Sequence, residues 1–471
     1  MHDNDVLTVL ASPSCRAEKS YIFDWVLGEI LGFNYRISFS PTHRAAITLA
    51  LPGKQTLRIQ DQFFENADQQ WLNPQTLPAH NSVVDFFITP KIRTHRSVSI
   101  PIHVPNLFPS INPTDTEEDD CCLALDIDIF GALFFLVSRY EEAVNPTRDQ
   151  HDRFPSGASI LGQLGLLDRA VGNEYIELLW AAMISCWPGL KRKHRTFRSL
   201  PSHDIDHPSL FAGPIQRVIR NLAGTLIKQK QPMVFMNRAA NWLRFKLGNC
   251  DVDPFDQIDW LMEQSELSNT KSAFFYIPEK THPLDASVSL ESPVVKQQWL
   301  RIDQRGHEIG YHPGYMTYAN QAAIQSGADR IRSLLQQYGI REREIGGRQH
   351  YLRWQTPTTA RNWEAAGLAY DSTLGFADRS GFRCGVCFEF PMYDVEERRP
   401  LKLRQRPLVV MDSTVTADHY MGLGLSSDAY NYIKSLKNEC RTFCGDFTIL
   451  WHNTELLTLQ QKDFYRSILS A

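Results

Sequence analysis

The second half of the chain alternates between short apolar runs and longer segments whose apolar residues recur at helical spacing. Lys271–Ile277 and His307–His312 are predicted strands, while Val294–Arg305 and Gln321–Tyr338 are predicted helices. Pro357–Ala366 is a further predicted helix, with a proline near its start. Repeated strand, loop and helix units are typical of a parallel α/β sheet or barrel. The pattern therefore predicts an α/β fold, with the chemistry at the carboxyl ends of the strands.

Polar side chains follow most of the predicted strands at the point where each strand ends. Further strands are predicted at Phe197–Leu200, Ile345–Tyr351, Leu368–Tyr370, Leu408–Met411 and Phe447–Trp451. The polar groups that follow the strands are Asp204 with Asp206, His312, Arg348 with His350 and Tyr351, Asp371, Asp412, and His452. Because parallel strands carry their chemistry at their carboxyl ends, we expect these side chains to belong to one active site.

Two carboxylates and two imidazoles lie close together in Ser202–His207. In an extended segment Asp204 and Asp206 point to one face, and His207 points to the opposite face. Two carboxylates on one face repel each other unless a cation or a proton lies between them. The pattern suits a metal-activated hydrolase, in which one carboxylate holds the metal and the other is a base. The alternative is a solvated loop with ordinary charged residues.

The length of 471 residues suggests two or three domains. Residues 1–190 are predicted to form a smaller α+β N-terminal domain with short strands and two helices, Phe130–Tyr140 and Leu166–Trp187. A basic linker at residues 191–197 leads to the α/β domain at residues 198–471.

Residues 209–270 are predicted to be a helical insertion in the second domain. Val218–Lys228 and Ala239–Phe245 carry apolar and aromatic residues between lysines and arginines. One interpretation is an amphipathic arm that makes peripheral contact with a membrane surface. The other is an ordinary helical insertion packed on the domain, and the sequence alone favours this second interpretation.

Composition limits the function classes. The formal net charge of −4 gives no basic surplus for nucleic-acid binding. The N-terminus lacks the features of a signal peptide, and the most apolar window, Ile129–Val137, is too short to cross a bilayer. We therefore expect a cytoplasmic protein without an integral membrane segment. Nine scattered cysteines fit this location, and the pairs Cys384/Cys387 and Cys440/Cys444 are interpreted as free thiols rather than a zinc site.

The order of these motifs resembles the polysaccharide deacetylases, a carbohydrate esterase family with the NodB homology region. His203–Asp206 is similar to the first motif of the family, which implies that Asp204 is the catalytic base and Asp206 a metal ligand. Glu308–His312 is similar to the second motif, which implies that His312 is a further metal ligand.

Two later motifs extend the resemblance over roughly residues 198–471. Arg348-x-x-Tyr351 is similar to the third motif, which implies that Arg348 pairs with the catalytic base and that Tyr351 shapes the substrate groove. Ile449–His452 is similar to the fifth motif, which implies that His452 is the general acid. The resemblance implies a distorted (β/α) barrel.

A sub-branch of this family is a closer match. Its motifs correspond here to His203–Asp206, His312-Pro313, Arg348–Tyr351, Asp371–Thr373 and Phe382–Gly385. Members of the sub-branch carry an uncharacterised domain before the deacetylase-like one. The segments Asp128–Gly131 and Ser138–Glu142 resemble that domain.

One departure from the family pattern concerns the metal site. The second motif has another histidine four residues after the first, and here Met316 stands at that position. A thioether is a poor ligand for hard or borderline cations. Either the third ligand comes from another group, with His207 as the prediction and His350 and Asp412 as alternatives, or the site no longer binds a metal tightly.

The resemblance implies a metal-dependent hydrolase of carbon–nitrogen bonds other than peptide bonds. The expected reaction is deacetylation of an N-acetyl (or O-acetyl) group on a cell-surface polysaccharide or its precursor, with a divalent metal, expected to be zinc. Substrate contacts are predicted from Tyr351, Tyr311, Trp451, His350, Asp371 and Asp412. For each aromatic residue the alternative role is core packing.

Two other functions stay open from the sequence. One is a catalytically inactive carbohydrate-binding or polysaccharide-assembly protein on the same fold. The other is a nuclease or phosphatase with two metals, for which the sequence lacks a clear second carboxylate cluster.

Overall fold

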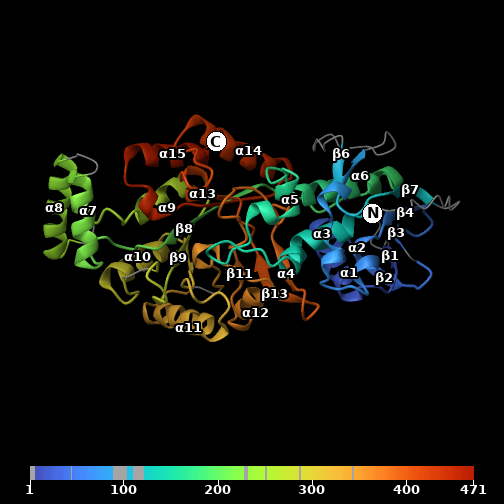
Figure 1. Ribbon diagram of the computed structural model, residues 1–471, viewed down its shortest axis with the longest axis horizontal. Coiled ribbons are helices and arrows are strands. Elements are labelled where there is room, and N and C mark those ends of the chain that lie inside the picture. The colour runs from blue at the N-terminus through green and yellow to red at the C-terminus, as the bar shows by residue number, and fades with distance from the viewer. Residues whose placement is uncertain are drawn as a thin grey trace.

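The computed structural model describes residues 6–43, 45–87, 103–109, 121–227, 232–249, 252–285, 288–341 and 344–470. It is a mixed α/β structure with one sheet system in each half of the chain (Figure 1). Among the described residues, no helix is both long enough and apolar enough to cross a membrane.

The N-terminal part is built on a five-stranded mixed sheet with the order β2-β1-β3-β4-β7. The strands are β1 (Leu7–Ala11), β2 (Tyr35–Phe39), β3 (Ala46–Ala50), β4 (Thr56–Gln60) and β7 (Cys121–Leu125). The main helices of this part are α1 (Arg16–Phe23), α3 (Ile129–Val137) and α6 (Val171–Cys186). Helix α6 packs on β4 and β7, and α3 packs on α1 and α6.

The C-terminal part contains the parallel sheet that the sequence pattern predicts. Its order is β10-β9-β8-β15-β14, and every pair is parallel. The strands are β8 (Arg198–Ile205), β9 (Ala273–Tyr276), β10 (Glu308–Tyr311), β14 (Val410–Met411) and β15 (Asp446–Leu450). The helices that follow or precede them are α9 (Ile258–Leu267), α10 (Pro293–Gln304), α11 (Gln321–Gln337), α12 (Thr358–Ala365), α14 (Ser427–Thr442) and α15 (Leu459–Ser470).

Single bridges extend this sheet beyond β10. Gly347 bridges in parallel to Tyr311 on one side and to Asp371 on the other. Asp371 belongs to β11 (Tyr370–Asp371), which pairs with β13 (Arg399–Gln405), and β13 pairs with β12 (Phe390–Asp394). In the described part of the chain no ladder joins β12 to β14, so closure into a barrel stays a prediction.

The strand boundaries differ from the sequence predictions at two places. The strand predicted at Phe197–Leu200 continues to Ile205, so Asp204 lies inside it. Ile345–Tyr351 pairs only through Gly347, where an added Cβ would lie 1.8 Å from the Tyr311 carbonyl oxygen. Only glycine tolerates so close a backbone approach. Beyond the predicted strands, β12 and β13 pair as an antiparallel hairpin, and the segment before β12 packs as irregular chain in the core.

The insertion forms two helices, α7 (Ile215–Ile227) and α8 (Pro232–Lys246). The pair lies at one end of the molecule and extends away from the parallel sheet (Figure 1). The two helices pack on each other, and their root packs through Val218 against Leu210, Phe211 and Phe255.

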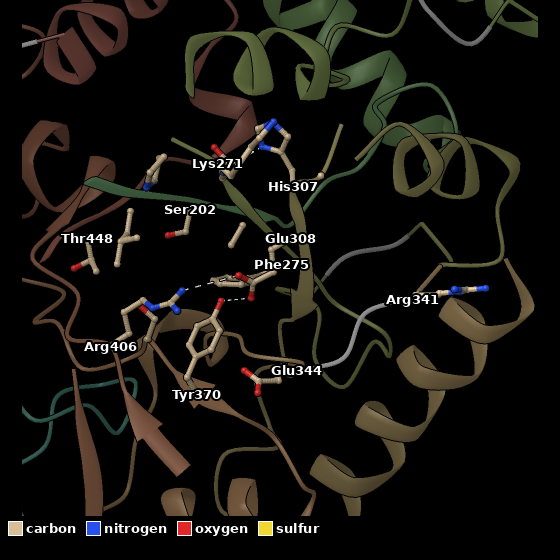
Figure 2. Close-up of a pocket in the computed structure, with 16 residues that line it drawn as sticks. Ser202, Lys271, Phe275, His307, Glu308, Arg341, Glu344, Tyr370, Arg406 and Thr448 are labelled. Atoms are coloured by element: carbon tan, nitrogen blue, oxygen red, sulfur yellow. Dashed lines mark hydrogen bonds and ion pairs between the residues drawn. The ribbon is translucent and has the colours of Figure 1, made fainter. Parts of the chain in front are cut away.

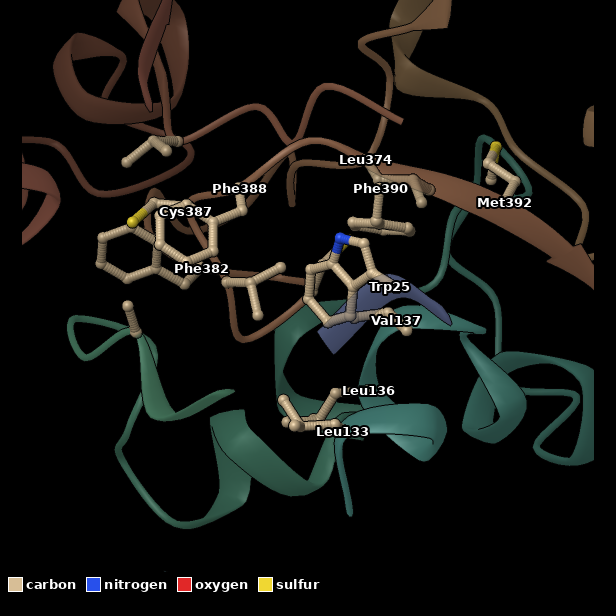
Figure 3. Close-up of a cluster of buried hydrophobic side chains, with 14 of the residues drawn as sticks. Trp25, Leu133, Leu136, Val137, Leu374, Phe382, Cys387, Phe388, Phe390 and Met392 are labelled. Atoms are coloured by element: carbon tan, nitrogen blue, oxygen red, sulfur yellow. The ribbon is translucent and has the colours of Figure 1, made fainter. Parts of the chain in front are cut away.

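The two halves of the chain share one apolar core. Trp25 and Leu136 of the N-terminal part lie against Phe382 and Phe390 of the C-terminal part (Figure 3). The indole of Trp25 donates a hydrogen bond to the Glu389 carbonyl at 3.2 Å. The proposed domain boundary at residues 191–197 stays a prediction, and the cysteines of this core are free thiols.

A buried charge cluster also connects the halves. Glu142 accepts hydrogen bonds from Arg139 Nε at 2.9 Å and from Arg383 Nε and Nη2, both at 2.8 Å. Arg139 Nη1 also donates to the Arg383 carbonyl at 2.7 Å. The Ser138–Glu142 and Phe382–Gly385 motifs therefore meet at one interface. Burial alone would raise the pKa of Glu142, but the charges and bonds of Arg383 and Arg139 lower it to about 2.

We predict that Glu142→Gln lowers the free energy of unfolding by ~3 kcal/mol at neutral pH, because two buried guanidinium groups lose their counter-charge. The depressed pKa adds stability that is present above the unfolded pKa of about 4.5 and is lost as pH falls towards 2. The difference between wild type and variant should therefore shrink over this range in urea unfolding. Asp463→Asn, which breaks an exposed pair with Arg466, is the control. A difference that does not depend on pH would contradict the assignment.

Candidate active site

Strand β8 places Asp204 against a fully buried arginine. Asp204 Oδ1 accepts a hydrogen bond from Arg348 Nη1 at 2.7 Å. Arg348 also donates from Nη2 to Ser202 Oγ at 2.8 Å and from Nε to the Ser372 carbonyl at 2.9 Å. Because these partners fix the guanidinium plane, the ion pair sets the orientation of the Asp204 carboxylate.

Three potential metal ligands lie on the same side of the sheet. The ligand atoms of Asp206, His312 and His350 all lie within 4.8 Å of one another. Asp206 Oδ1 is 3.2 Å from His312 Nε2, and Asp206 Oδ2 is 3.7 Å from His350 Nε2. The buried Asp206 Oδ1 and His312 Nε2 have no hydrogen-bond partner. One carboxylate and two imidazoles form a donor set that fits zinc and other divalent transition metals.

Both histidines are held with Nε2 directed towards Asp206. His312 Nδ1 donates to the Arg348 carbonyl, and His350 Nδ1 donates to Asp285 Oδ1 at 2.7 Å. A metal-binding histidine commonly donates its other ring N–H to a carbonyl or carboxylate, which leaves the facing nitrogen free to bind the metal. Both rings are therefore oriented as metal ligands are. The partner of His312 is a backbone carbonyl, and the partner of His350 is the carboxylate of Asp285.

Asp285 lies in the loop after β9 and is fully buried. Its Oδ2 accepts from the Thr281 and His282 backbone N–H groups at 2.7 and 2.8 Å, and its Oδ1 from the Tyr315 N–H at 2.8 Å. Burial would raise the pKa of Asp285, but these bonds and the bond from His350 hold it well below its usual value. A rigid, charged carboxylate thus orients the His350 ring.

His207 and Met316 do not join this group of ligands. His207 Nδ1 accepts a hydrogen bond from Arg217 Nη1 at 3.0 Å, and its ring stacks on Phe255. Strand alternation turns His207 away from Asp206. The Met316 side chain is 54% exposed. The geometry therefore gives no support to His207 as the third ligand and favours His350, which was an alternative in the sequence analysis.

His452 lies across from these ligands and is paired with Asp412. His452 Nδ1 donates to Asp412 Oδ1 at 2.8 Å, and the His452 backbone N–H donates to Asp412 Oδ2 at 2.6 Å. His452 Nε2 lies 3.8 Å from Asp206 Oδ2. Burial lowers the pKa of His452, but the charge and bond of Asp412, with smaller contributions from Asp206 and Asp204, raise it to about 10. Asp412 is buried and orients His452.

The charges of Asp206 and His350 stabilise each other. Burial would raise the pKa of Asp206, but His350, His312 and His452 hold it well below its usual value. Burial would lower the pKa of His350, yet Asp206 and Asp285 raise it to about 9. The proton on His350 thus balances the charge of Asp206, and the ring must release this proton before its Nε2 can bind a metal.

These groups open onto a cavity of about 710 Å³, lined by Asp204, Asp206, His350, Tyr351 and His452 among others. The N-terminal part contributes one wall. His151 Nδ1 is 2.9 Å from the Tyr315 hydroxyl, and its ring lies 5.0 Å from the Tyr351 ring. Arg153 donates to the Tyr420 hydroxyl at 3.3 Å. Tyr351 adopts a positive φ of 63°, a conformation that is uncommon for tyrosine and occurs at functional sites.

Four of the six predicted substrate-contacting residues do not line the cavity, and one of them is Asp412, which is buried and bonded to His452. Tyr311 is buried, and its hydroxyl donates to the Ile324 carbonyl at 3.2 Å. Trp451 is buried against Tyr465. Asp371 accepts from the Thr373 backbone N–H at 2.8 Å, and its burial raises its pKa to about 7. These side chains belong to the core, because each lacks access to the cavity. Tyr351 and His350 line it.

A second cavity, of about 590 Å³, lies at the opposite ends of the parallel strands (Figure 2). Glu308 lies there between the Tyr370 hydroxyl, which donates to it, and Arg406, whose Nη1 is 4.0 Å away. Arg406 also donates to Glu389 at 2.6 Å. These groups neutralise one another, and the carboxyl ends of parallel strands are where ligands bind. We therefore assign the chemistry to the first cavity.

Several residues of the site carry no signal in the sequence. Asp285 follows the end of β9 by nine residues, in a loop without a motif. His151 and Arg153 come from the N-terminal part, 50 or more residues before the first motif. A search for carboxylates in loops would find Asp285 only as one of many candidate partners for a histidine. The contribution of the N-terminal part to the cavity could be found only from the structure.

Comparison with known proteins gives limited results. A family of unknown function (DUF7033) matches residues 7–188. No curated protein matches the chain. A crystal structure assigned as a polysaccharide deacetylase from Mycobacterium smegmatis aligns with 16% identity and a TM-score of 0.38, covering 60% of this chain and 85% of that one. Puue allantoinase aligns with 12% identity and a TM-score of 0.34, with the same coverage of each chain. Because both TM-scores are below 0.5, no conclusion is drawn from these likenesses.

We predict that Asp285→Asn weakens the affinity for zinc by roughly 10- to 100-fold, because His350 loses a charged partner. Competition with a chromogenic chelator measures the affinity. Asp253→Asn is the matched control: Asp253 is also buried and also accepts three backbone N–H groups, from Leu210, Phe211 and Phe255, but contacts no candidate ligand. Equal affinities for all three proteins would contradict the role of Asp285.

Proposed function

We propose that this protein is a metal-dependent hydrolase that removes an acetyl group from a carbohydrate, with zinc as the expected metal. The observation that carries the proposal is the arrangement around one cavity. The cavity is lined by a carboxylate held by Arg348, by Asp206 and His350 of the group that also includes His312, and by an imidazolium held by Asp412. These are the parts that metal-assisted amide hydrolysis requires.

A divalent cation held by Asp206, His312 and His350 supplies Lewis acidity, which polarises a carbonyl oxygen and makes water more acidic. Asp204 Oδ2 lies 3.6 Å from His312 Nε2 and so faces this group, while Oδ1 is held by Arg348. In our proposal Asp204 accepts the proton of the attacking water. Arg348 positions the carboxylate.

His452 is the proposed general acid. Its raised pKa keeps the ring protonated at neutral pH, so Nε2 can give a proton to the leaving amine or alcohol. Asp412 fixes the ring by binding Nδ1, which directs Nε2 into the cavity. The base thus lies in β8 and the acid lies two residues after β15, and these two strands pair side by side.

The proposed substrate is an acetylated polysaccharide or its precursor. The cavity combines aromatic rings, Tyr351 and Tyr420, with polar groups such as His151 and Asp378. Aromatic faces and hydrogen-bonding groups together suit the apolar and polar surfaces of a sugar. The residues of the N-terminal part that form one wall of the cavity also determine its shape. Membership of the polysaccharide deacetylase family is part of the proposal.

We predict that the zinc-loaded full chain releases acetate from N-acetylhexosamine oligosaccharides. Asp204→Asn should lower kcat by about 10²- to 10⁴-fold, because the base is lost, while zinc still binds. An enzyme-coupled acetate assay and metal analysis measure the two effects separately. Protein that holds no divalent cation and releases no acetate from N- or O-acetylated oligosaccharides would leave the alternative of an inactive carbohydrate-binding protein.

We also predict that His350→Ala abolishes stoichiometric zinc binding, whereas His207→Ala retains it. The reason is that His350 Nε2 faces Asp206, whereas His207 is bonded to Arg217. Zinc content after gel filtration gives the result, and circular dichroism checks that both variants are folded. Loss of zinc in His207→Ala alone would restore His207 as the third ligand.

A further inference from the structure

The helical arm, defined here as α7 and α8 with their connection, has an unusual charge. Residues 209–250 contain seven Lys and Arg residues and no Asp or Glu. Because the whole chain carries −4, the remaining residues carry −11. A segment of +7 on an acidic protein is strongly attracted to polyanionic surfaces and is repelled by a second copy of itself.

Helix α7 exposes apolar side chains on one face. Ile215, Ile219 and Leu226 are spaced so that they share one side of the helix, and each is more than 40% exposed. Val218 and Leu222 border these side chains and pack at the root of the arm. The exposed apolar side chains therefore do not contribute to the packing of the arm.

Helix α8 shows the same division. Met233, Met236, Leu243 and Leu247 are spaced along one side, and Leu247 is 88% exposed. Trp242 packs towards the core of the arm. Of the fourteen large hydrophobic residues that are exposed in the described part of the chain, eight lie on this arm. This concentration marks an interaction surface.

We propose that the helical arm docks on the surface of an anionic lipid bilayer, with its exposed apolar side chains in the interface. Basic residues stand beside the apolar ones, with Arg220 next to Ile219 and Lys246 next to Leu247. A basic amphipathic helix gains affinity from both buried apolar area and attraction to anionic lipid. A nucleic acid would bind the cations but would leave the apolar side chains in water. The proposal therefore takes the amphipathic-arm interpretation over that of an ordinary insertion packed on the domain.

The root of the arm contacts the strand that carries the candidate site. Arg217 of α7 donates to His207, and Asn453 donates to the His207 carbonyl at 2.9 Å. His207 directly follows Asp206. Helix α7 has thirteen residues, so it spans about 20 Å. Docking through the arm therefore brings the cavity close to the bilayer surface.

Cosedimentation with sucrose-loaded vesicles tests the proposal on the full chain. One set of vesicles contains phosphatidylcholine alone, and the other contains equal parts of phosphatidylcholine and phosphatidylglycerol. Wild-type protein should sediment with the anionic vesicles and not with the neutral ones. Binding should weaken as sodium chloride is added, because salt screens the attraction. Acetate release is not used, so the result is independent of the proposed reaction.

Two triple variants separate the contributions. Ile219→Ser with Met236→Ser and Leu243→Ser removes apolar area, and should weaken binding at least about tenfold. Arg220→Gln with Arg244→Gln and Lys246→Gln removes charge, and should weaken binding by about a hundredfold. All six side chains are exposed, so the fold does not depend on them, and thermal unfolding verifies this.

Matched controls carry the same chemical changes elsewhere. Leu267→Ser with Leu300→Ser and Leu459→Ser alters exposed apolar residues, and Arg36→Gln with Lys54→Gln and Lys402→Gln alters exposed basic residues. Both controls should bind like wild type. The proposal is overturned if wild-type protein does not bind anionic vesicles, or binds neutral vesicles equally. It is also overturned if the arm variants bind as well as the controls, and a protein partner is then the occupant of this surface.

Discussion

Two carboxylates on one face of one strand set the conditions for the whole candidate site. Asp204 in β8 and Asp206 directly after it both line the same cavity, and they repel each other unless positive charge compensates them. Arg348 compensates Asp204, and the imidazoles of His312 and His350 face Asp206. Because different groups balance their negative charges, the two carboxylates differ in their chemistry. One is held in a fixed ion pair and is suited to be a base, whereas the other keeps a buried oxygen without a partner and is suited to bind a cation.

The groups that compensate the carboxylates are themselves held by an outer layer of polar contacts. Asp285 holds His350, Asp412 holds His452, and the Arg348 carbonyl holds His312. The N-terminal part supports this arrangement from one side, through the buried contacts of Glu142 with Arg383 and through His151 at the cavity wall. We conclude that the two halves of the chain act as one structure at this site, even though the family model covers only residues 7–188.

The sequence predicts the α/β class and most elements of the parallel sheet, because period-2 and period-3.6 patterns are strong in β9, β10 and α11. Strand alternation also predicts that Asp204 and Asp206 share a face. Long-range pairing is not encoded locally, so the sequence leaves His207, His350 and Asp412 as candidates for the third ligand, and the position of the Asp285 loop favours His350. The sequence does not distinguish aromatic residues that line the cavity from those that pack in the core. Tyr311 and Trp451 are core residues, whereas Tyr351 lines the cavity. Its positive φ cannot be predicted from the motif.

A crystal structure of the zinc-soaked protein, with anomalous data collected at the zinc edge, tests the central claim most directly. The account predicts one anomalous peak within bonding distance of a carboxylate oxygen of Asp206, His312 Nε2 and His350 Nε2, with the Asp285–His350 hydrogen bond retained. A peak bound by His207 or by the Met316 sulfur, or zinc-soaked crystals without a peak at Asp206, would contradict it.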